Sequence, residues 1–281
     1  MIGKTSVVID SASYLPAAVI ERFGAIVVPL TVVLDGHEYR EFEDIDAASF
    51  YTRLAAGAKV STSQPPPGRF LDAYSRAREL GAEQVVSIHI GSGLSGTVNS
   101  ARVAAEVAGI PVHVLDTGQA SFIEGLCAWE AMDVLAAGGS IAAAEAAVRR
   151  VSEQAGNVFI VRGTELLARG GRYAEGEVAG VPVLALVDGA IRPIGSASDT
   201  EQALAAIVGH VTSKAGTNQG DLMRIGVANG AAEELAGMLE ARLRKALPGA
   251  EIMQYTIGPV VGAHTGPGCT GAVFLPRGRA R

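Results

Sequence analysis

The chain has 281 residues, of which 48% are hydrophobic, and its formal net charge is −6. This length and apolar content allow one or two domains with substantial cores, and we expect two. The acidic balance argues against nucleic acid as a main partner, because phosphate backbones are bound by clustered basic side chains. The first residues run directly into a strand-like segment without the regions of a signal peptide, so we expect a cytoplasmic protein.

Neither a metal site nor a membrane span is indicated. Cys127 and Cys269 are the only cysteines, and they form no CxxC pattern or His-Cys cluster. Residues 252–276 lack charged side chains and are long enough to cross a bilayer, but glycines and prolines interrupt the segment repeatedly. We therefore expect no metal, no disulfide framework and no stable membrane insertion.

Strand-like and helical segments alternate through the first half of the chain. Strands are predicted at residues 6–9, 25–33, 85–90 and 111–116, and Pro29 marks either an edge strand or a break in the second of them. Helices are predicted from about residue 16, within 41–57, after Gly68, after Gly96, after Ser121 to about 137, and from a Ser140 cap to 155. Asp35-Gly36 marks a turn. Repeated β-α alternation predicts a parallel sheet covered by helices, so we assign residues 1–155 to an α/β domain.

The pattern changes near residue 156. Asp188-Gly189 lies between two apolar strands and predicts a hairpin, which introduces antiparallel pairing. The other predicted elements are strands at 158–161, 222–228, 251–257 and 272–275, a helical turn at 165–169 and helices at 200–210 and 232–247. We assign residues 156–281 to an α+β domain with a mixed sheet.

A glycine-rich loop follows the predicted strand 85–90. Its residues Gly91-Ser-Gly93-Leu-Ser-Gly96 match GxGxxG and open a helix, while Asp116 ends the next strand. This arrangement is typical of a dinucleotide site, so an NAD-type enzyme is one hypothesis. Almost ninety residues of other structure precede the loop, and no hydride-transfer apparatus is recognisable. If the loop is not a dinucleotide site, Ser95 either serves only as a helix N-cap or helps to bind a different anion.

Two further segments carry candidate ligand groups. Ser61-Thr62-Ser63 precedes a proline-rich turn, and its hydroxyls either cap local backbone or face a ligand. His264 lies in a glycine- and proline-rich segment, 258–268, which we expect to be a loop; there the ring is either simply exposed or held where it hydrogen-bonds a carboxylate or phosphate. His89, on a predicted central strand, is expected to be a core residue.

Several motifs in order along the chain resemble one family. They are Asp10-Ser11, Val28-Pro29-Leu30, Thr62-Ser63-Gln64-Pro65, Ile88-His89-Ile90 with Ser92-Gly93-Leu94-Ser95-Gly96-Thr97, Asp116 with Ala120-Ser121, Gly170-Gly171-Arg172 and Ile257 to Gly268 around His264. On these residues the chain resembles the DegV family of fatty-acid-binding proteins, which serve in bacterial phospholipid metabolism. The family usually has small residues after Ser121, where this chain has Phe122-Ile-Glu124.

The resemblance implies a DegV-like, two-domain protein that binds a long-chain fatty acid and needs no cofactor. It also implies a non-catalytic role: the protein presents the carboxylate to a separate ATP-dependent fatty acid kinase, its partner, which forms an acyl-phosphate. The implied carboxylate ligands are Thr62, Ser63, Ser95, Gly96 and His264, and the implied headgroup support or partner docking residues are Arg172, Thr265 and Ser121. A binding module for another carboxylate or a phospholipid stays open as an alternative.

Overall fold

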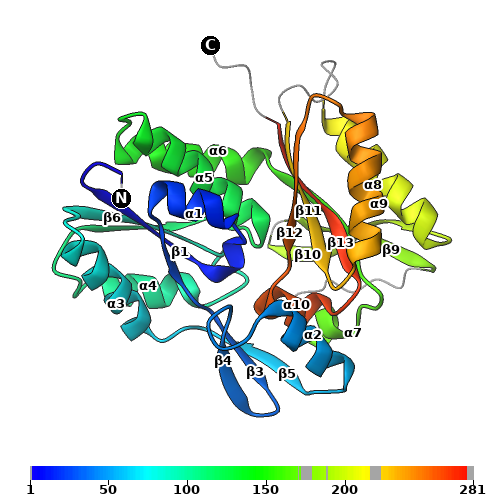
Figure 1. Ribbon diagram of the computed structural model, residues 1–281, viewed down its shortest axis with the longest axis horizontal. Helices are drawn as coiled ribbons and strands as arrows, with labels where there is room; N and C mark the ends of the chain where they lie inside the picture. Colours follow the sequence, from blue (N-terminus) through cyan, green and yellow to red (C-terminus); the bar gives the residue numbers. More distant parts are fainter. Residues whose placement is uncertain (1, 170, 172–178, 188, 216–222, 277–281) are drawn as a thin grey trace. The chain divides into compact units, whose positions relative to one another are not determined.

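The computed structural model describes residues 2–169, 171, 179–187, 189–215 and 223–276 (Figure 1). Two compact units are present: Met1–Ile45 with Ser61–Glu153, and Asp46–Val60 with Gln154–Arg281. Residues 46–60, which we expected in the first domain, are grouped with the second unit. The expected division into domains 1–155 and 156–281 stays a prediction.

The first unit is built on a parallel four-stranded sheet with the order β2-β1-β6-β7. The strands are β1 (Thr5–Asp10), β2 (Ile26–Val28), β6 (Gln84–His89) and β7 (Val112–Asp116). Because the strands are parallel, their carboxyl ends meet at one edge. The strand order changes direction between β1 and β6, and such a switch point is where open α/β sheets place ligands. Asp10 and His89 end these two strands.

Helices cover both faces of this sheet (Figure 1). They are α1 (Ala17–Phe23), α3 (Pro67–Glu79), α4 (Thr97–Ala105), α5 (Phe122–Ala136) and α6 (Ile141–Gln154), with a short 3-10 turn η1 (Ser11–Ser13) after β1. α3 and α4 bury Phe70, Tyr74 and Ala101 against the sheet. The predicted cap of α6 is confirmed, since Ser140 Oγ accepts a hydrogen bond of 3.2 Å from the Ala143 N–H.

A small three-stranded sheet, β4-β3-β5, completes the unit. Its strands are β3 (Thr31–Leu34), β4 (His37–Arg40) and β5 (Val60–Ser63). The predicted turn is confirmed: Asp35 (φ 52°) and Gly36 (φ 84°) both adopt the left-handed backbone that a two-residue hairpin loop requires. The break at Pro29 is also confirmed, because it separates β2 from β3.

The second unit contains a six-stranded mixed sheet with the order β10-β9-β8-β13-β11-β12. Its strands are β8 (Gly156–Ile160), β9 (Val181–Val187), β10 (Ala190–Ala197), β11 (Met223–Gly230), β12 (Glu251–Thr256) and β13 (Cys269–Pro276). β11 and β12 are parallel, whereas the β9–β10 hairpin and the other pairs are antiparallel. α8 (Thr200–Lys214) and α9 (Glu233–Ala246) pack on this sheet (Figure 1). The predicted fold class is confirmed.

Three short helices of the second unit pack together: α2 (Ala47–Ala55), α7 (Glu165–Arg169) and α10 (Pro259–Thr265). α10 corrects the expectation of a loop at residues 258–268. Pro259 occupies the first turn, where its missing N–H costs nothing, and Gly266 (φ 71°) follows the last turn. Glycine and proline here delimit a helix. Gly68 likewise lies inside α3, which begins at Pro67 rather than after Gly68.

Candidate functional site

The loop Gly91–Gly96 leaves β6 in a fixed conformation. The Gly91 N–H donates to the Gln119 carbonyl (2.7 Å), and the Gly91 carbonyl accepts from the N–H groups of Leu94 (2.9 Å) and Ser95 (3.1 Å). A Cβ on Gly91 would lie 2.6 Å from the Gly118 carbonyl carbon. Gly91 is therefore required because the loops after β6 and β7 approach each other closely.

Ser95 lies at the start of α4 and is half-buried. Its Oγ accepts from the Thr97 N–H (3.3 Å) and is 2.8 Å from the Thr97 hydroxyl. The residue at the helix boundary is Gly96, one position later than the predicted N-cap. A hydroxyl has one donor and two acceptor sites, so capping leaves Ser95 with capacity for a further hydrogen bond.

The end of β5 lies directly beside this loop. A Cβ built on Gly96 would be only 1.5 Å from the Gln64 Oε1, so Gln64 occupies the space next to Gly96. Thr62, half-buried, and Ser63, exposed, immediately precede Gln64. The first unit thus brings the predicted residues Thr62, Ser63, Ser95 and Gly96 to one region. The contact of Gln64 was not predicted, because nothing local in the sequence indicates it.

Asp116 supports the loop backbone. Its Oδ1 accepts from the N–H groups of Ser92 (3.1 Å) and Gly118 (2.9 Å). Partial burial alone would raise the pKa of Asp116, but these hydrogen bonds outweigh it and lower the pKa below its usual value. In a dinucleotide site this carboxylate would instead bind the ribose hydroxyls. Two residues of the hypothetical dinucleotide site, Gly91 and Asp116, therefore have a role within the protein itself: they hold the loops after β6 and β7 together.

Ser121 precedes α5 with φ 60° and ψ −151°. This backbone region is adopted readily only by glycine, and a serine there costs on the order of 1–3 kcal/mol. Such strain persists where the surroundings hold the residue in place, and it is common at ligand sites. The role of Ser121 in headgroup support stays a prediction.

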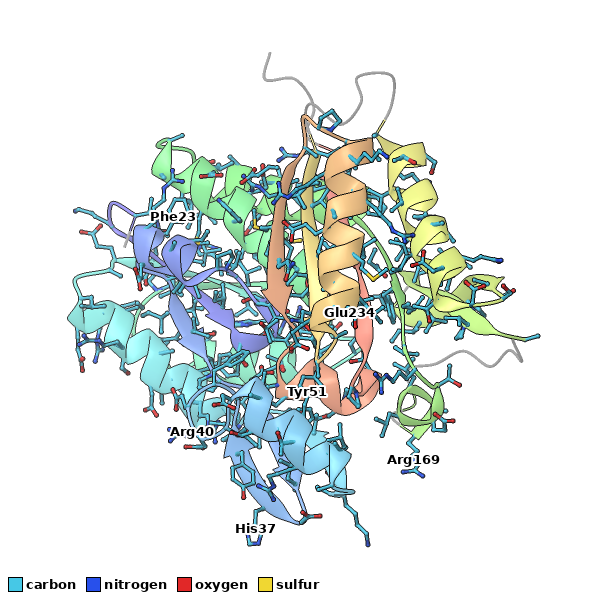
Figure 2. All side chains as sticks on the ribbon, turned by 45° about the vertical axis from the view of Figure 1, so that its right-hand side comes forward. Phe23, His37, Arg40, Tyr51, Arg169 and Glu234 are labelled. Atoms are coloured by element: carbon cyan, nitrogen blue, oxygen red, sulfur yellow. The ribbon has the colours of Figure 1, made fainter. Side chains whose placement is uncertain are left out.

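The remaining predicted residues belong to the second unit. His264, half-buried, and Thr265, buried, form the last turn of α10, where Thr265 Oγ1 donates to the Val261 carbonyl (3.3 Å). α2, which carries Tyr51 (labelled in Figure 2), supports this helix: the Tyr51 hydroxyl donates to the Ile257 carbonyl (3.2 Å), directly before α10. Arg172 lies outside the described residues. Participation of His264, Thr265 and Arg172 in one site with Ser95 stays a prediction.

A buried hydrogen-bonded chain lies behind the loop. The Asp10 Oδ2 accepts from the Ile90 N–H (3.0 Å) and from His89 Nδ1 (3.2 Å). Because a carboxylate only accepts, His89 Nδ1 donates to Asp10, and Nε2 lies 2.5 Å from the Ser87 Oγ. Tyr74 Oη lies 2.9 Å from Ser87 Oγ. His89 is fully buried, as predicted, and Asp10 holds the backbone immediately before Gly91.

Two negative findings concern the described part of the chain. No group of three or more His, Cys, Asp or Glu side chains there is arranged to hold a metal ion. No helix there is long and apolar enough to span a bilayer.

Comparisons with known proteins extend these observations. A family model described as an uncharacterised protein of the DegV family matches residues 4–277. A DegV domain-containing protein of Streptomyces coelicolor is 37% identical over 284 aligned positions, which cover 99% of this chain and 100% of the relative.

Solved structures give the same result. A DegV family protein from Thermus thermophilus, described by its fatty acid binding, has a TM-score of 0.89 at 32% identity, with coverage of 97% of this chain and 99% of that one. A stearic acid-binding protein from Eubacterium ventriosum has a TM-score of 0.87 at 25% identity, with coverage of 96% and 97%.

Proposed function

Since this chain belongs to the DegV family, we propose that it binds a long-chain fatty acid and presents the carboxylate to a separate ATP-dependent fatty acid kinase. The observation that carries the proposal is the proximity of β5 to the loop Gly91–Gly96 in the first unit. It gives a carboxylate two hydroxyl-bearing segments, with Thr62 and Ser63 on one and Ser95 on the other. The fatty acid binding of the Thermus and Eubacterium relatives supports the same class of ligand.

The chemistry of the site suits a carboxylate with an apolar tail. Hydroxyl donors and the backbone N–H groups at the start of α4 stabilise a negative headgroup, and hydrogen bonds to a charged acceptor are stronger than neutral ones. Each methylene removed from water contributes about 0.8 kcal/mol, so the tail dominates affinity. His264, Thr265, Ser121 and Arg172 remain the proposed supporting or docking residues.

Extraction of the purified protein and mass spectrometry test the ligand. We expect a bound fatty acid, or uptake of added oleate after delipidation. A protein that neither carries nor binds any fatty acid contradicts the proposal. Titration with NADH tests the dinucleotide hypothesis in parallel, and we expect no binding because Asp116 is occupied by Ser92 and Gly118.

Alanine substitutions test the headgroup ligands. We expect the double variant Thr62→Ala/Ser95→Ala to lose at least about tenfold in oleate affinity while it stays folded, because two donors to the carboxylate are removed. Thr52→Ala is the control, since the Thr52 hydroxyl on α2 donates to the Ala48 carbonyl (2.8 Å) of its own helix. Unchanged affinity in the double variant refutes this pairing.

The kinase step needs its own test. The loaded protein, ATP and a purified bacterial fatty acid kinase are incubated with hydroxylamine, which traps an acyl-phosphate as a hydroxamate. We expect hydroxamate only when the kinase is present, because the chain acts as the carrier. Hydroxamate formed by the chain alone would show that it is itself a kinase.

A further inference from the structure

Glu124 is a carboxyl group that the proposed ligand site does not use. It lies in the first turn of α5, its side chain is fully buried, and no N–H or O–H group of the described residues donates to either carboxyl oxygen; the side chain that it meets is the Asp10 carboxyl. An ionised carboxyl in this state would lose its hydration without compensation, which is strongly unfavourable. The Glu124 side chain is therefore expected to be neutral in this otherwise apolar segment of α5.

Other acids surround Glu124 within the first unit. Burial raises the pKa of Glu124 well above its ordinary value, and Asp10 and Glu41 raise it further. Both neighbours are buried: Asp10 is 0% exposed and Glu41 is 1% exposed. The N-terminus of α5 favours a negative charge, but this effect is weaker than complete desolvation beside two acids.

The groups facing this cluster explain which acid holds a proton. Asp10 accepts from Ala12, His89 and Ile90, so three donors stabilise its charge. Glu41 accepts from the hydroxyls of Ser11 and Tyr14. Glu124 has no such donor. Cys127, about one turn further along α5, is a buried thiol, and burial raises its pKa, so it carries no charge that could compensate Glu124. α1 also packs on α5, but its Arg22 pairs with Asp133, more than two turns away.

The cluster lies under the proposed ligand loop. α5 packs against η1, and a Cβ on Gly125 would be 2.3 Å from the Ser13 carbonyl oxygen, so Glu124 is held close to the end of β1. Asp10, at that end, fixes the Ile90 N–H directly before the loop Gly91–Gly96. A change in charge beside Asp10 therefore acts on the support of this loop.

We propose that Glu124 holds a proton in the folded protein and shares it with the Asp10 carboxylate in a hydrogen bond, and that this carboxyl pair positions the loop Gly91–Gly96 so that fatty acid binding weakens when the proton is lost. Glu124 donates to the Asp10 carboxylate and keeps the pair at a single negative charge. Loss of the proton places two like charges side by side in the interior. The coupling to the ligand rests on the proposed function, whereas the shared proton does not.

Unfolding experiments without ligand test the shared proton. A group protonated in the folded state makes folding less favourable as pH rises above its ordinary value of 4.5. We expect the folding constant of wild type to fall relative to that of Glu124→Gln by up to about tenfold per pH unit, until the folded group also ionises. Glu130→Gln, on the same helix but paired with Arg150 (3.2 Å), is the control and should follow wild type.

An infrared spectrum of wild type serves if Glu124→Gln does not fold. We expect the carbonyl stretch of a protonated carboxyl at neutral pH and its loss at high pH. Parallel pH profiles for wild type and Glu124→Gln, or no such infrared band, would overturn the proton-sharing pair.

Oleate titrations between about pH 6 and pH 9 test the coupling, because a free fatty acid is ionised over most of this range. We expect the affinity of wild type to fall at least about tenfold toward high pH relative to Glu124→Gln. Affinities that change equally in the two proteins overturn the positioning role even if the proton is shared. If oleate binds at no pH, the proposed function and the coupling fail together, and the ligand-free measurements still decide the shared proton.

Discussion

The two units of the protein differ in what they bury. In the first unit, buried polar and charged side chains gather near the carboxyl ends of β1 and β6: Asp10, Ser11, Ser13, Glu41, Ser87, His89 and Glu124. In the described part of the second unit, the buried polar or charged side chains are Arg224, Thr265 and Thr270, and the core between the sheet and α8 and α9 is apolar. Burial of polar groups is costly and demands complete hydrogen bonding. Their concentration beneath the loops that follow β1 and β6 therefore indicates that they hold those loops in position.

Replacement of Asp10 by alanine should cause the largest loss of stability, because Asp10 is central to the buried polar network of the first unit. Asp10→Ala leaves the buried donors of His89, Ile90 and Ala12 without their acceptor, and we expect a loss of about 3–5 kcal/mol in the free energy of unfolding. Urea unfolding measures this loss. A change below about 1 kcal/mol would mean that the network contributes little to the first unit.

A substitution in the apolar core of the second unit provides the comparison. Leu239 is fully buried on α9, and Leu239→Ala should lower the free energy of unfolding by about 3 kcal/mol, because apolar burial is lost and a cavity forms. This loss of stability, measured by urea unfolding at several pH values, should not vary with pH, because the packed cluster is apolar and no Asp or Glu in the described part of the second unit is buried. A marked pH dependence would show that the two cores are less different than described.

Glycine substitutions should sharpen the comparison at the ligand loop itself. Gly96→Ala forces its Cβ against the Gln64 side chain, and we expect oleate affinity to fall about tenfold with only a small loss of stability. Gly93→Ala is the matched control, since nothing lies within 4 Å of its added Cβ. Equal effects of the two substitutions would contradict the role assigned to the contact between β5 and the loop.

The smallest effect is expected at an exposed acid of the first unit. The hydrogen bonds from Arg40 hold the pKa of Asp44 at about 2, below its usual 3.8. This interaction therefore stabilises the fold above pH 3.8 and is lost as pH falls through about 2. An NMR titration of the Asp44 carboxyl checks the midpoint, and Asp44→Asn should leave stability at neutral pH almost unchanged because the pair is solvent-exposed.

Local patterns predicted most of the fold. The Asp35-Gly36 turn, the hairpin around residue 189 and the Ser140 cap depend on a few adjacent residues, and the structure contains all three. The sequence analysis does not predict α10, because the glycines and prolines of residues 258–268 favour a loop when only their number is considered. Their order, proline at the start and glycine after the end, was the available signal for a helix.

The candidate site was less accessible to prediction, because its contacts join distant segments. The proximity of Gln64 to Gly96 has no local signature, and neither does the approach of Glu41 to Ser11. In the sequence, Glu124 is noticeable only because it departs from the small residues that the family usually has after Ser121. Its partner Asp10 lies on another strand, so the sequence indicated an unusual residue without indicating its role.

The grouping of α2 with the second unit has a consequence for how the protein is made. α2 leaves the ribosome early, but α10, whose Gly262 packs against Tyr51 of α2, is synthesised much later. Phe50 and Tyr51 of α2, which contact Gly262 of α10 in the folded protein, therefore lack this contact during most of translation. A nascent chain stalled before α10 should expose these two side chains to chaperones, and a fragment beginning at residue 154 should need α2 supplied as a separate peptide.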